Sequence, residues 1–204
     1  LHAHGVNGVM TDYEEKFYHE GKPICRCVAV RGETLSARLE LVRPQAEHEA
    51  MVRAYRQVFL DAGEVCNGSS GLEFMEDYET WRTVNALGAN PGWVKGDTFL
   101  ALDTQGQMVG IVNVRHSLNE ALTRIGGHIG YSVLPTFRRR GYATVILGLA
   151  LAYSREVLGL EEVLLHCYDD NAASVRTILH YKAELEGKVT DEEGHLVRRY
   201  RVEL

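Results

Sequence analysis

Apolar residues recur along this chain with two periods, which divide residues 37–204 into strands and helices. Over residues 38–43, Leu39 and Leu41 alternate with charged neighbours, as in a half-buried strand. Within residues 141–158 the apolar positions recur instead at helical spacing and form one buried face: Ile146, Leu149, Ala150, Tyr153 and Val157. Gly159 then predicts the end of that helix.

The same two periods predict the remaining elements. We expect helices over 44–61, 74–87 and 171–182, and strands over 98–103, 108–116, 127–134, 162–167, 185–190 and 196–203. The order β-α-α-β-β-β-α-β-α-β-β indicates one mixed α/β domain over 37–204. Residues 1–36 lack such periodicity, so we expect an N-terminal extension or flexible arm there, of natural or engineered origin.

Composition and charge narrow the class of protein. The chain has 204 residues, 45% of them hydrophobic and 25% charged, which is typical of a globular domain. Its formal net charge of -6 argues against nucleic acid as a partner. No apolar run reaches transmembrane length and no signal peptide is recognisable, so we expect a cytoplasmic protein with no membrane partner.

The four cysteines are consistent with a cytoplasmic protein. Cys25, Cys27, Cys66 and Cys167 make no disulfide framework in a chain of this length, which favours a reducing compartment. The spacing of Cys25 and Cys27 does not match common zinc sites. We therefore expect no metal.

The most informative segment is the basic turn Arg138-Arg139-Arg140-Gly141-Tyr142-Ala143, which lies between a predicted strand and a predicted helix. The first N–H groups of a helix have no partner inside the helix and carry partial positive charge. Gly141 would let an anion approach the backbone closely. The turn therefore predicts a phosphate site; the alternative is a surface arginine cluster at a helix start.

Two motifs together resemble a known family. Arg138-x-x-Gly141-x-Ala143 after a strand resembles the acyl-CoA pyrophosphate loop of the GNAT N-acetyltransferase superfamily. Asn171-x-x-Ser174, after the strand over 162–167, is similar to a second signature of that superfamily. The resemblance covers 37–204 and is tightest over 99–183. Residues 115–119 and 126–131 are similar to a bacterial branch of predicted acetyltransferases.

The resemblance implies a fold and a donor site. The fold is a mixed, mostly antiparallel twisted sheet flanked by helices, with a V-shaped splay between its fourth and fifth strands. Acetyl-CoA is the implied co-substrate. Its implied contacts are the strand Tyr131, Ser132 and Val133, the amides of Arg139, Arg140, Gly141, Tyr142 and Ala143, the side chains of Arg138 and Arg140, and Asn171 and Ser174. Asn171 could instead cap the following helix.

Three residues are candidates for the catalytic steps: His128, His116 and Tyr181. His128 stands where many family members have a glutamate, and its imidazole could take the proton of an amine; it could equally be a buried histidine bonded across the sheet. His116 could line the same cleft or bind a loop carbonyl. The family's tyrosine acid is replaced here by Ile178, which leaves the nearby Tyr181 as a candidate.

These features predict an acyl-CoA-dependent N-acyltransferase that transfers acetyl to a primary amine of a small molecule or a protein. We expect the acceptor pocket within 67–93 and 117–124, where Glu73, Glu76, Asp77 and Glu79 would attract a cationic amine or simply form a solvated helix face. The chain would act as a monomer or homodimer. The alternative is a non-catalytic acyl-CoA-binding or sensor module, because Ile178 removes the usual acid.

Overall fold

The computed structural model describes residues 39–87 and 93–204, with side chains at 39–84 and 93–204. Before residue 39 it describes the backbone of six short strands: β1 (Tyr13–Glu14), β2 (Tyr18–His19), β3 (Lys22–Pro23), β4 (Arg26–Cys27), β5 (Val30–Gly32) and β6 (Leu35–Ala37). The side chains of the predicted extension over 1–36, including those of Cys25 and Cys27, lie outside the described residues.

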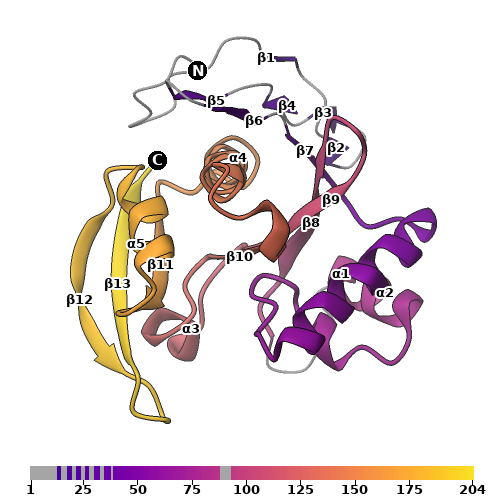
Figure 1. The fold of residues 1–204 in the computed structure, drawn as a ribbon. Coiled ribbons are helices and arrows are strands. Elements are labelled where there is room, and N and C mark those ends of the chain that lie inside the picture. Colours follow the sequence, from indigo (N-terminus) through magenta and orange to yellow (C-terminus); the bar gives the residue numbers. More distant parts are fainter. Residues whose placement is uncertain are drawn as a thin grey trace.

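Two antiparallel sheets form the frame of the domain (Figure 1). The first has the order β10-β9-β8-β7 and consists of β7 (Leu39–Val42), β8 (Gly96–Asp103), β9 (Met108–Arg115) and β10 (Ile129–Val133). The second has the order β11-β13-β12 and consists of β11 (Glu162–Tyr168), β12 (Glu184–Thr190) and β13 (Leu196–Glu203).

Helices cover both faces of the first sheet and close two apolar clusters. On one face, α4 (Tyr142–Glu156) buries Ile146 and Leu147 against Phe99 and Val112. On the other face, α1 (Glu49–Ala62) and α2 (Tyr78–Leu87) pack Tyr55 and Trp81 against Leu100 and Ile111. Because neighbouring strand residues point to opposite faces, β8 serves both clusters through Phe99 and Leu100.

The predicted elements and their order are confirmed, and the main differences come from capping. Residues 72–74 form a separate 3₁₀ turn, η2 (Leu72–Phe74), and α2 begins four residues later than predicted. The Asp77 carboxylate accepts the Thr80 N–H at 2.7 Å and so fixes that start. The structure also contains an unpredicted short helix, α3 (Glu120–Arg124), where Asn119 Oδ1 accepts the Leu122 N–H at 2.9 Å.

The two sheets meet only briefly, at the start of β10. Gly127 and Leu165 form an isolated bridge, and the His128 N–H donates to the Leu164 carbonyl at 2.8 Å. Beyond that point β10 and β11 belong to separate sheets, as the predicted splay between the fourth and fifth strands requires. Short 3₁₀ turns η1 (Ala46–His48) and η3 (Pro135–Phe137) precede α1 and α4, and α5 (Ala172–Leu179) follows β11.

Candidate active site

The start of α4 is an open cradle of backbone amides. Gly141 is the N-cap at φ 84, no side chain caps the helix, and a Cβ at Gly141 would meet nothing within 4 Å. Arg139, two residues earlier, also has a positive φ of 63. The first N–H groups of the helix therefore face open space with partial positive charge, as a bound pyrophosphate requires.

The three arginines of this turn make different contacts. Arg138 donates from Nε to the Val133 carbonyl at 3.1 Å and forms a two-pronged ion pair with Glu64, just after α1. This hydrogen bonding lowers the pKa of Glu64. All three arginines are exposed, but Arg138 joins the end of α1 to β10. Arg140 lies over the Phe137 ring, 5.4 Å from its centroid.

One edge of β10 faces the splay. The Arg115 N–H donates to the His128 carbonyl and the Leu134 N–H donates to the Val109 carbonyl, so in this register the backbone groups of residues 130, 132 and 134 point toward β9. In an antiparallel strand the intervening residues bond in the opposite direction. The backbone groups of Tyr131 and Val133 therefore point into the splay, where the resemblance places the pantetheine arm.

The side chains of Tyr131 and Ser132 point to opposite faces of β10. The Ser132 carbonyl accepts the Tyr55 hydroxyl at 3.0 Å, and its Oγ lies 3.1 Å from the same hydroxyl. Tyr131 packs instead against the cluster under α4. Burial raises the pKa of Tyr131 to about 12, and the nearby Ser174 of α5 opposes this, although the buried Tyr131 hydroxyl makes no hydrogen bond within the described residues. Tyr131 and Ser174 therefore lie together beside the splay.

Asn171 is the N-cap of α5, because its Oδ1 accepts the Ser174 N–H at 3.0 Å. This is the capping alternative considered for Asn171, and it uses the side-chain oxygen. The amide nitrogen of an asparagine can still donate to a ligand.

His128 is bonded twice to one residue of β11. Besides the backbone bond described above, its Nδ1 accepts the Leu164 N–H at 2.9 Å. Burial lowers the pKa of His128, and the nearby Arg115 lowers it further. The neutral ring therefore carries its proton on Nε2 and has no free lone pair for an amine proton. This geometry favours the buried, cross-sheet histidine over the general base.

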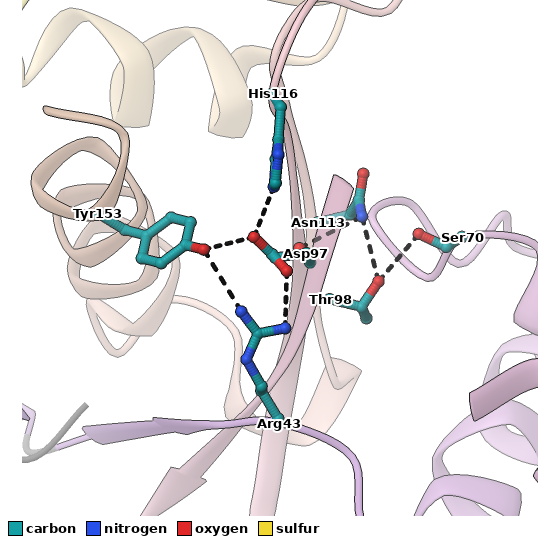
Figure 2. A network of polar contacts seen from close by, with 7 residues as sticks. All are labelled: Arg43, Ser70, Asp97, Thr98, Asn113, His116 and Tyr153. Carbon is teal, nitrogen blue, oxygen red and sulfur yellow. Dashed lines mark hydrogen bonds and ion pairs between the residues drawn. The ribbon is translucent and has the colours of Figure 1, made fainter. Parts of the chain in front are cut away.

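His116 joins a buried polar network on the α4 face (Figure 2). Its Nε2 lies 2.6 Å from Oδ2 of Asp97, and this oxygen also accepts the Tyr153 hydroxyl. The other carboxylate oxygen, Oδ1, pairs with Arg43 at 2.6 Å. Burial would raise the pKa of Asp97, but the hydrogen bonds from His116, Arg43 and Tyr153 outweigh it and hold the pKa well below its usual range. The sequence did not single out Asp97.

The neighbouring residue of β8 continues this network on the other face of the sheet. Thr98 Oγ1 lies 3.0 Å from Ser70 Oγ and accepts the Asn113 side-chain amide at 3.1 Å. The same amide donates to the Asp97 carbonyl at 3.3 Å. Figure 2 shows the contacts running from Tyr153 on α4 to the loop that carries Ser70.

Tyr181 is buried beneath α4, where its hydroxyl donates to the Thr144 carbonyl. A Cβ at Gly148 would come within 2.3 Å of this hydroxyl, so the helix has a glycine where the ring packs. Ile178, at the position of the family's tyrosine, is buried in the same cluster. Neither side chain presents a hydroxyl to the splay.

A cavity of about 430 Å³ opens on the face of the sheet that carries α1 and α2. Both segments expected to form an acceptor pocket line it, together with Asn113 and Arg115 of β9. Of the four acidic residues considered for this region, only Glu73 is among the lining residues; its Oε2 accepts the Ser69 hydroxyl at 2.8 Å. Val84, Trp93 and Leu122 give the cavity an apolar wall.

Residues 38–184 match the family model described as an acetyltransferase (GNAT) domain. The chain belongs to the GNAT acetyltransferase family. It is therefore an acetyltransferase of the class that takes its acyl group from acetyl-CoA, and the predicted family and fold are confirmed. No curated protein sequence matches the chain significantly.

Solved structures share the GNAT fold at low identity. A spermidine N-acetyltransferase, SpeG, from Vibrio cholerae is 17% identical with a TM-score of 0.59, over 81% of this chain and 93% of that one. RimL, a ribosomal L7/L12 alpha-N-protein acetyltransferase in complex with coenzyme A, is 21% identical with a TM-score of 0.60, over 81% and 94%. A GNAT family acetyltransferase from Bacillus anthracis is 18% identical with a TM-score of 0.56, over 83% and 97%.

Three further observations concern the described part of this GNAT domain. None of its helices is both long and apolar enough to cross a membrane. Within the same residues, no three His, Cys, Asp or Glu side chains gather in an arrangement that could hold a metal ion. Cys66 and Cys167 are free thiols, and burial raises the pKa of each to about 11, which keeps them protonated.

Arg115 was not assigned to the pocket from the sequence, although the alternation of polar and apolar residues along β9 indicates that position. Asn113 and Arg115 alternate with the buried Val112 and Val114 along β9. The valines belong to the cluster under α4, so the polar residues must face the other side, where the cavity lies.

Proposed function

We propose that this protein transfers acetyl from acetyl-CoA to a primary amine of a small molecule or protein, by direct attack of the amine. The observation that carries the proposal is the uncapped start of α4 at Gly141, beside the backbone edge of β10 that faces the splay. The 430 Å³ cavity supports it, because the loop over residues 66–71 that lines this cavity packs directly on β10.

The donor would be held mainly by backbone. The amides at the start of α4 would bind the pyrophosphate, and Arg139 and Arg140 would add charge from the surface. The Tyr131 backbone would bond the pantetheine arm as a further strand would, and a β10 N–H would stabilise the oxyanion. Arg138 would contribute by fixing the loop, since Glu64 already binds its guanidinium.

The acceptor amine must lose a proton to attack. Acetyl-CoA, when bound, supplies the thioester carbonyl that is attacked. Glu73 is the carboxylate among the described lining residues of the cavity, so we assign it to orient the ammonium group and receive its proton, directly or through water. His116 is the second candidate, whereas the Leu164 N–H occupies the Nδ1 lone pair of His128. The thiolate leaves without a dedicated acid, because a thiol with a pKa of about 8.5 is a tolerable leaving group.

The donor site is tested by Gly141→Glu. Calorimetry should show acetyl-CoA binding to the wild-type protein and none to this variant, because the carboxylate would lie against the pyrophosphate. Gly159→Glu is the matched control: Gly159 has a similar φ of 68 and a Cβ there meets nothing within 4 Å, but it follows the C-terminal end of α4. Wild-type affinity in Gly141→Glu would refute the phosphate site.

Binding without turnover is the outcome that would favour a sensor. The sensor alternative rests on Ile178 and on the bond from Tyr181 to Thr144, which place no tyrosine acid at the family's position. CoA release from acetyl-CoA, measured against a panel of amines, decides between the two. Release that depends on an amine supports the enzyme; tight acetyl-CoA binding with no release against any amine supports the sensor.

A further inference from the structure

Arg115 is a half-buried cation on the wall of the cavity. Its Nη1 donates to the Gly127 carbonyl at 2.7 Å, which fixes the guanidinium at the meeting point of the two sheets. No ion pair of Arg115 occurs among the described residues. By contrast, the half-buried Arg43 and Arg198 each pair with a carboxylate, of Asp97 and Asp169 respectively.

Arg115 lies near two half-buried histidines, on which the carboxylates of Glu162 and Glu186 also act. Burial lowers the pKa of Arg115. His128 and His166 lie close enough for its charge to depress their own pKa values, which burial already lowers, to about 4 in the case of His166. A partly desolvated guanidinium beside neutral imidazoles gains more binding free energy from an anionic ligand than a solvated guanidinium does, because little water must be displaced from it.

We propose that the acceptor is a primary amine that carries a carboxylate, and that Arg115 binds this carboxylate in the cavity. The proposal rests on the proposed acetyl transfer and specifies its substrate class. A guanidinium fork matches a carboxylate geometrically and can offer it two parallel N–H groups. The cavity then holds one charge of each sign, with Glu73 available to the ammonium group and Arg115 to the carboxylate.

The apolar wall fits such a substrate. Trp93, Val84 and Leu122 would cover the carbon skeleton between or beside the two charged groups. A polyamine, with cationic groups alone, would match Glu73 but would place a positive charge in the cavity that holds Arg115. Because like charges repel strongly where solvent is partly excluded, the cavity disfavours that class of acceptor.

Acceptor preference of the wild-type protein is the direct test. The panel is a series of amino acids from glycine to 6-aminohexanoate, leucine, the matching carboxamides, and spermidine. We expect kcat/KM for at least one carboxylate to exceed that of its carboxamide by about tenfold or more, as one charge-assisted pair allows. Equal or better turnover of carboxamides or spermidine throughout the panel would overturn the proposal.

Variants of Arg115 test whether this residue causes the preference for carboxylates over carboxamides. Arg115→Met should bring the carboxylate-to-carboxamide ratio of kcat/KM close to one, and Arg115→Lys should retain part of it. Arg124→Met removes an equal charge from an exposed arginine of α3 and should keep the wild-type ratio. An unchanged ratio in folded Arg115→Met would refute the assignment.

Failure of the inference is distinguishable from failure of the enzyme. Should Arg115→Met fold poorly for want of its bond to Gly127, Arg115→Lys and the wild-type panel still decide the matter. Amine acetylation without carboxylate preference would remove only the inference. Absence of both acetyl-CoA binding and turnover in the wild-type protein would remove the proposed function and this inference with it.

Discussion

At the scale of single residues, hydrogen-bond partners decide which candidate side chains can do chemistry. His128 was attractive because histidine titrates near neutrality, yet Leu164 occupies its Nδ1. Tyr181 has the right hydroxyl, yet it donates to the Thr144 carbonyl. In both cases the bond holds two elements together: β10 to β11, and the end of α5 to α4.

His128→Asn separates a structural role from base catalysis. The Asn Oδ1 takes the place of Nδ1 and can still accept the Leu164 N–H. We therefore expect a melting temperature and a kcat close to wild type in a coupled CoA-release assay, whereas His128→Leu, which lacks the acceptor, should lose about 1–3 kcal/mol of stability. If His128 is instead the base, folded His128→Asn will lose kcat by about 100-fold or more.

At the scale of elements, the loop over residues 66–71 reaches β10 only because two glycines face each other. A Cβ at Gly68 would lie 2.2 Å from the Gly130 carbonyl oxygen, and one at Gly130 would lie 3.2 Å from the Gly68 Cα. Gly68 also has a φ of 77. This backbone contact brings the wall of the cavity against β10, one edge of which faces the splay.

Gly68→Ala should push the loop away from β10. The clash with backbone adds to the cost of a positive φ, so we expect a destabilisation of about 2–3 kcal/mol by urea unfolding and a raised KM for the acceptor. Gly106→Ala is the control, because Gly106 has a φ of 74 with nothing within 4 Å of its Cβ. That variant should lose only about 1 kcal/mol and keep its KM. Equal losses in the two variants would argue against the close contact.

At the scale of the whole molecule, Asp97 ties together β7, β8, β9 and α4 through Arg43, His116 and Tyr153 (Figure 2). Because its pKa is depressed in the folded protein, the unfolded chain takes up a proton first as the pH falls. The stabilisation by Asp97 is thus complete above its unfolded pKa of about 3.9 and is lost progressively below it.

Asp97→Asn should therefore destabilise the protein in a pH-dependent manner. We expect a loss of roughly 3 kcal/mol at pH 7, the lower end for a buried pair because Arg43 is partly exposed. The difference from wild type in urea unfolding should shrink below about pH 4. Glu49→Gln, which breaks the exposed pair with Arg53, should cost less than about 1 kcal/mol. A pH-independent loss in Asp97→Asn would contradict this linkage.

Local patterns were sufficient for most of the fold. Alternation along β7 and the helical face of α4 are written in neighbouring residues, and so is the glycine turn at Gly141, because each depends on backbone geometry over a few positions. Caps are local too, but weaker: Asp77 and Asn119 set the starts of α2 and α3, and the sequence analysis placed the first start four residues early and predicted no second helix there. The order of elements and the family motifs then indicated a GNAT domain.

The sequence by itself thus determined the elements, the family and the glycine turn at the start of α4, since each is encoded within one contiguous segment. Only the tertiary structure decided which polar side chains are committed to other partners. Arg138 meets Glu64 and Asp97 meets Arg43 across 74 and 54 residues of chain. Arg115 and Glu73 come to one cavity from different elements. Such encounters depend on how whole elements pack, because hydrogen bonds and charges act through space and leave no local pattern in the sequence.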